Sequence, residues 1–90
     1  MNGNNSDSMV GLGRVQLYED NGDLSEAFGL FKMAAEQSSP EGLYYTGYCY
    51  LYGYGTEKSV ERAYHYLARA KELGCSDADH LINTTPQYPE

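Results

Sequence analysis

The sequence of 90 residues has no tryptophan, two cysteines, three prolines and only six basic residues. No apolar run approaches the roughly 20 residues of a membrane-spanning helix, so we expect no membrane span. The segment from Met1 to Ser8 has neither a basic region nor an apolar core, and therefore does not resemble a secretion signal. Cys49 and Cys75 lack metal-type spacing, which favours free thiols in a cytoplasmic setting but leaves open whether they pair.

The scarcity of positive charge excludes two classes of partner. Thirteen acidic residues against six basic ones give a formal net charge of -7. Without a cluster of Lys and Arg, the chain has nothing with which to neutralise phosphates, so we expect neither nucleic-acid binding nor adsorption to an anionic membrane. The acidity would attract a basic protein partner. The alternative is that the charge serves solubility alone.

Tyrosine is abundant: there are ten, and six of them fall between Tyr44 and Tyr54. Apolar residues make up 41% of the chain and charged residues 21%, proportions typical of a globular protein.

The chain also repeats one pattern. Leu12-Gly13 is followed by Leu17-Tyr18 and later by Ala27, and Thr46-Gly47 is followed by Leu51-Tyr52 and later by Ala63. A third start at Ala78 places Asn83 where the earlier passes have glycine, so the spacing is 34 and then 36 residues. This period is typical of helix–turn–helix repeats.

Local signals divide the repeats into helices. Asp23 to Glu26 forms a capping box, Ser39-Pro40 and Ser59 can begin helices, and Gly74 can end one. The expected helices are 8–19, 24–37, 40–52, 59–73 and 77–83. We therefore predict an all-α fold, a short α-α superhelix (solenoid) of about two and a half helix–turn–helix repeats. The expected organisation is a flexible N-terminus at 1–7, a repeat domain at 8–83 (repeats 8–38, 42–74 and a partial 78–83) and an extended tail at 84–90.

The second repeat resembles a known family. The stretch from Gly42 to Gly55 is similar to the first helix and Gly-x-Gly loop of a Sel-one-like repeat, a relative of the tetratricopeptide repeat, and the stretch from Glu61 to Gly74 is similar to its second helix. Thr46 stands where the family has Leu, and the first repeat lacks the Gly-x-Gly loop. The resemblance implies a scaffold, adaptor or regulator. Small bacterial relatives include inhibitor and immunity proteins, and a few secreted relatives handle β-lactams.

In arrays of this kind the first helix of each repeat lines the concave face. Tyr44, Tyr48 and Tyr52 follow one another at helical spacing on such a helix. Tyr and Arg are enriched in binding hot spots. Alignment of the repeats then predicts a partner-binding surface with the following members: Arg14, Tyr18, Tyr44, Tyr48, Leu51, Tyr52 and His80. The alternative is that these rings pack between helices, as we expect for Tyr50, Tyr64 and Tyr66.

No catalytic motif accompanies this pattern. His65 and His80 have no nucleophile at a recognisable spacing, and Cys75, Asp77, Asp79 and His80 do not form a zinc motif. We expect no enzyme activity, metal or cofactor.

Three functions remain as hypotheses. The first is a protein–protein interaction module, and the second is a small acidic inhibitor, immunity or anti-defence protein that blocks a partner enzyme. The third, a β-lactam-handling enzyme, is disfavoured because the chain lacks a disulfide framework and a secretion signal. Self-association is a further expectation, because arrays this short leave apolar ends uncovered.

Overall fold

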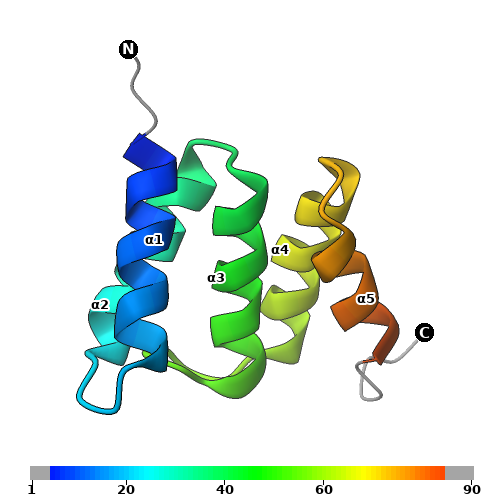
Figure 1. Ribbon diagram of the computed structural model, residues 1–90. Helices are drawn as coiled ribbons and strands as arrows, with labels where there is room; N and C mark the ends of the chain where they lie inside the picture. Colours follow the sequence, from blue (N-terminus) through cyan, green and yellow to red (C-terminus); the bar gives the residue numbers. More distant parts are fainter. Residues whose placement is uncertain (1–4, 85–90) are drawn as a thin grey trace.

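Helices account for most of the computed structural model, which describes residues 5–84 and side chains from Ser8 onward. The five helices within this range are α1 (Asn5–Tyr18), α2 (Leu24–Glu36), α3 (Pro40–Tyr52), α4 (Val60–Glu72) and α5 (Ser76–Thr84). Figure 1 shows α1, α3 and α5 in the nearer layer, with α2 and α4 behind them. The described part of the chain contains no strand, so the all-α repeat prediction is confirmed.

The predicted capping residues begin the helices. The Asp23 carboxylate accepts hydrogen bonds from the backbone N–H groups of Ser25 and Glu26, at 3.0 and 3.2 Å. Ser39 accepts from the N–H of Gly42 at 3.2 Å, and Pro40 occupies the first turn of α3, where a missing N–H costs nothing. These caps satisfy donors that a helix leaves free at its start, which is why the sequence located these boundaries well.

The two ends of the array differ from the expected boundaries. α1 begins at Asn5 and not near residue 8, and α5 extends through Thr84, which was assigned to the tail. The rest of the flexible N-terminus and of the extended tail, 1–4 and 85–90, lies outside the described residues.

The core consists of two clusters on either side of α3. The first joins α1, α2 and α3, and contains Val10, Ala27, Phe31, Ala34 and Cys49. The second joins α3 to α4 and α5, and its larger buried members are Leu43, Tyr50, Leu51 and Leu67. Each helix packs mainly on its neighbours in the chain, as in a solenoid.

The glycine that recurs in each repeat has a packing role. A Cβ atom added to Gly13 would lie 2.6 Å from the Phe31 ring, and one added to Gly47 would lie 2.8 Å from Leu67 Cγ. Phe31 and Leu67 come from the second helix of the respective repeat. The repeated glycine therefore lets the two helices of one hairpin approach closely.

Candidate functional site

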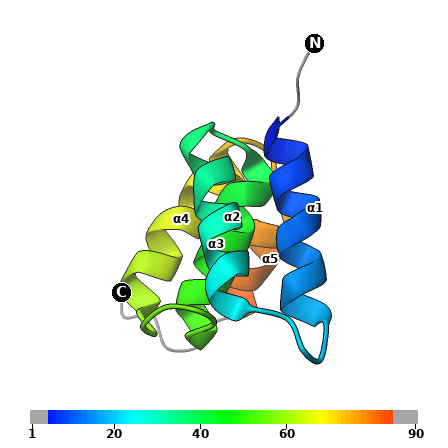
Figure 2. The same ribbon diagram turned by 90° about the vertical axis from the view of Figure 1, so that its left-hand side faces the viewer.

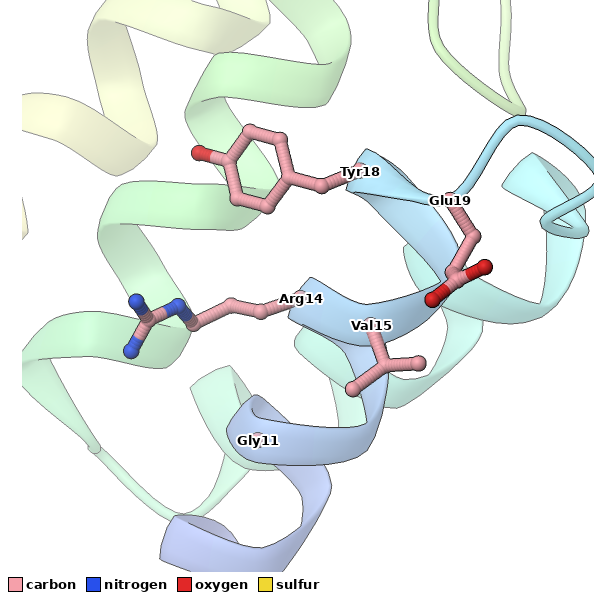
Figure 3. A pocket seen from close by; sticks show the side chains of 5 residues that line it. All are labelled: Gly11, Arg14, Val15, Tyr18 and Glu19. Atoms are coloured by element: carbon pink, nitrogen blue, oxygen red, sulfur yellow. The ribbon is translucent and has the colours of Figure 1, made fainter.

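Five tyrosine rings form a continuous aromatic network along α3 and the loop that follows it. Tyr44 contacts Tyr45 and Tyr48, and Tyr48 contacts Tyr52, with ring centroids 4.9, 6.1 and 5.0 Å apart. Tyr54 lies 5.9 Å from Tyr48 and 5.6 Å from Tyr52. Together with Tyr18, which points from α1 toward α3 (Figure 3), these rings are called the tyrosine surface below.

Tyr45 anchors this network to the core. Its ring stacks on the buried Phe31 ring of α2, with the two ring centroids 4.7 Å apart. The guanidinium of Arg14, on α1, lies 6.0 Å from the centroid of the Tyr45 ring. Such stacked and cation–π contacts restrict the ring beyond simple burial. The tyrosine surface therefore rests on three helices, although most of its rings come from α3.

The exposure of the rings increases toward the edges of the surface. Tyr44, Tyr45 and Tyr48 are partly buried. Tyr52 and Tyr18 keep 49% and 62% of their surface exposed. A partner could therefore cover aromatic area that this chain leaves in water.

The surroundings of these three partly buried rings raise the pKa of their hydroxyl groups. Burial, together with the neighbouring Tyr45 and Asp77, raises the pKa of Tyr44 to about 12. Burial and the nearby Tyr18 likewise raise the pKa of Tyr45 and of Tyr48, although Arg14 lowers that of Tyr45. At neutral pH these groups are neutral phenols that can both donate and accept hydrogen bonds.

A hollow of about 420 Å³ lies beside the tyrosine surface. Its walls come from Arg14 of α1, from Tyr44 and Tyr45 of α3, and from the turn that leads into α5. The carboxylates of Glu41 and Asp77, each in the first turn of a helix, also line it. The hollow thus offers aromatic faces together with charges of both signs.

Alkaline pH is expected to destabilise the folded protein through this site. An unfolded chain releases the Tyr44 proton near its usual pKa of 10.0, whereas the folded chain holds it to about 12. The folded state binds more protons in this interval, so the contribution of Tyr44 is complete below pH 10 and is lost as the pH rises toward 12. Tyrosinate absorbance and circular dichroism, recorded during one titration, measure both changes.

Tyr44→Phe is the control for this titration, because it removes the late proton and should flatten the alkaline loss of stability. Ionisation of every tyrosine near pH 10 with unchanged helix content would contradict the assignment.

The structure brings most of the predicted surface together. Tyr44, Tyr48 and Tyr52 are in contact, and Figure 3 shows Arg14 and Tyr18 pointing from α1 toward α3. His80 is exposed on α5, one turn beyond Asp77, and none of the contacts described for residues 8–84 joins it to the rings.

The prediction that Leu51 belongs to the partner-binding surface was wrong. It is only 7% exposed and belongs to the cluster that joins α3 to α4 and α5. The physical reason is its register, one turn after Gly47, on the side of α3 that packs against α4.

Two members of the surface were not predicted, Tyr45 and Tyr54. Tyr54 returns to α3 because Gly53 and Gly55 both adopt positive φ, 74° and 73°, and its N–H donates to the Cys49 carbonyl at 2.9 Å. The Gly-x-Gly loop carried this signal, since paired glycines allow the chain to reverse. Tyr45 follows Tyr44 directly, and only the position of α2 shows which way its ring points.

The two cysteines differ in their surroundings, because Cys49 is buried and Cys75 is partly exposed. Burial raises the pKa of the Cys49 thiol to about 12, and Cys49 and Cys75 are both free thiols. Among the residues described, no group of three or more His, Cys, Asp or Glu side chains is positioned to hold a metal ion. Within the same residues, no helix is long and apolar enough to cross a bilayer.

Comparisons with known proteins agree with the repeat architecture. A Sel1 repeat protein from Oxalobacter formigenes has a similar fold, with a TM-score of 0.80 and 24% sequence identity over 87% of this chain. The chain spans 23% of the length of that protein. No match was found among curated proteins. The sequence model of the Sel1 repeat matches residues 6–39 and 40–75, so the chain belongs to the Sel1 repeat family, whose members generally mediate protein–protein interactions.

Proposed function

We propose that this chain holds a segment of another protein on the tyrosine surface. The observation that carries the proposal is the network of Tyr44, Tyr45, Tyr48, Tyr52 and Tyr54, whose rings contact one another and yet remain partly open to solvent. The network lies along α3, and Tyr18 points toward it from α1. The first helices of an array of this kind are expected to line its concave face.

Ring packing within the network favours binding energetically. Contacts among the rings already limit their rotation, so these side chains lose little further entropy when a partner binds. Each ring offers a large apolar face and each hydroxyl a directional hydrogen bond, the combination that makes tyrosine frequent in binding hot spots.

The partner-capture experiment compares three forms of the chain. The wild type, Tyr48→Ala/Tyr52→Ala and the matched control Tyr64→Ala, on the opposite layer in α4, are each immobilised and exposed to lysate. We expect a partner that the wild type and the control retain and that the double variant binds at least about tenfold more weakly, since hot-spot tyrosines each contribute more than about 1 kcal/mol. Circular dichroism checks that all three are folded. Equal capture by the double variant would contradict the proposal.

The acidic character favours a second candidate, an inhibitor, immunity or anti-defence protein that blocks a basic enzyme. The net charge is -7, and nearly all the described acidic side chains are exposed. Such a complex would form by electrostatic steering, so its association rate would fall steeply with added salt. Salt-insensitive association, together with unchanged activity of the captured partner, would leave the scaffold function in place and remove this candidate.

A further inference from the structure

One face of α1 carries exposed apolar side chains that do not pack in the core of this protein. Leu12 and Val15 are 58% and 54% exposed, and a Cβ atom added to Gly11 would meet nothing within 4 Å. Figure 3 shows Val15 beside Arg14 and Tyr18, and these residues line one hollow with Gly11 and Glu19. The stripe of Ser8, Gly11, Leu12 and Val15 therefore borders the tyrosine surface at Tyr18.

The equivalent positions of the second repeat show how such a stripe packs. Residues 6–39 and 40–75 match the same repeat, so Ser8 corresponds to Gly42, Gly11 to Tyr45, Leu12 to Thr46 and Val15 to Cys49. On α3, three of these positions are buried, and the fourth, Tyr45, packs against α2 while remaining partly exposed. A Cβ added to Gly42 would lie 2.6 Å from the Ala34 Cβ of α2, Tyr45 stacks on Phe31, and Thr46 and Cys49 are fully buried.

α5 repeats this use of the face. Ala78, 36 positions after Gly42, is fully buried in the cluster with α4. The first helices of the later repeats, α3 and α5, thus pack this face against the helix that precedes them. On α1 the same face is exposed to solvent. α1 therefore has the face with which a first helix contacts the preceding repeat, and none of the residues described covers it.

The stripe is self-complementary. If two α1 helices cross antiparallel about a two-fold axis between Gly11 and Leu12, Leu12 of one copy lies over Gly11 of the second, and Val15 lies over Ser8. Large side chains thus meet small ones, and none of the four residues carries a charge. The apolar faces of α2 and α4 are largely buried inside each copy, whereas α1 leaves Leu12 and Val15 exposed. We propose that two copies of this chain associate through α1, with Leu12 and Val15 at the centre of the contact.

The size of α1 limits the strength of this dimer. A helix of 14 residues is about 21 Å long, and one helix pair of that length buries on the order of 700 Å² in total. Stable complexes bury about 1,200–2,000 Å², so the dimer is weak. Each copy carries a charge of -7, and screening of this repulsion strengthens association as salt is added.

Sedimentation equilibrium of the full chain tests the proposal from about 10 µM to about 1 mM protein, in about 0.05 and about 0.5 M salt. We expect the average mass to rise from 10.0 kDa toward twice that value, and to rise earlier at the higher salt. Val15→Glu buries a charge in the contact and should weaken the dimer at least about tenfold. Leu73→Glu, at a position that is 50% exposed at the end of α4, is the matched control and should behave as the wild type.

A second variant guards against misfolding as an explanation. Gly11→Leu has free space within its own chain and favours the helix, yet it fills the gap that Leu12 of the second copy needs. It should remain folded and lose dimerisation. A constant mass of 10.0 kDa at every concentration would overturn the proposal. Association that survives Val15→Glu and Gly11→Leu, or that is abolished by Tyr48→Ala/Tyr52→Ala, would overturn it too, because the contact would then lie elsewhere.

Discussion

Phe31→Ala is expected to lower the free energy of unfolding by about 3–5 kcal/mol, a large part of the stability of a domain this small. Phe31 is fully buried in the cluster that joins α1, α2 and α3. Its ring lies against Gly13, which has no side chain to move into the space that alanine would leave. The variant therefore keeps a cavity and loses the contacts of an entire ring.

The same substitution should loosen the tyrosine surface, because Tyr45 loses the ring on which it stacks. Urea denaturation followed by circular dichroism measures the stability, and near-ultraviolet dichroism reports the packing of the tyrosines. Met33→Ala, on the same helix but 47% exposed, is the control and should change stability by no more than about 0.5 kcal/mol. Equal losses from the two variants would show that α2 does not pack on α1 and α3 as described.

Gly47→Ala and Gly11→Ala are expected to change stability in opposite directions. A methyl group at Gly47 would lie 2.8 Å from Leu67 Cγ and 2.9 Å from the backbone oxygen of Ala63, which cannot rotate away. Overpacking of this kind costs about 1–3 kcal/mol and should outweigh the gain in helix propensity. At Gly11 the space is free, so alanine should stabilise α1 by up to about 1 kcal/mol.

Denaturation at low protein concentration, where self-association does not contribute, measures both differences. The sign is the decisive result, since propensity alone predicts stabilisation at both sites. A stabilised Gly47→Ala would mean that α3 and α4 are further apart than the structure places them.

The fold could be predicted from the sequence because its signals are local. Asp23, Ser39 and Ser59 each cap the helix that follows them, and the 34-residue spacing of Gly13 and Gly47 marks the two hairpins. The prediction was wrong at the start of α1, which was expected near residue 8, because the helix begins at Asn5.

The candidate site was less predictable because it depends on which side of α3 each neighbour occupies. Spacing placed Tyr44, Tyr48 and Tyr52 on one stripe, and the structure keeps them in contact. Spacing did not show that α4 and α5 cover Leu51 on one flank, or that α2 holds Tyr45 on the other. Periodicity along a single helix does not show which neighbouring helix packs on each of its sides, because that depends on the tertiary structure.

The preference of each helix for its neighbours in the chain also affects how fast the fold can form. α1 pairs with α2, α2 with α3, α3 with α4 and α4 with α5, so most contacts close short loops. Loop closure of this kind costs little entropy, and helical proteins with such local contacts reach the folded state within microseconds to milliseconds. The chain can therefore assemble hairpin by hairpin, and the first hairpin, α1 with α2, can form before α5 has left the ribosome.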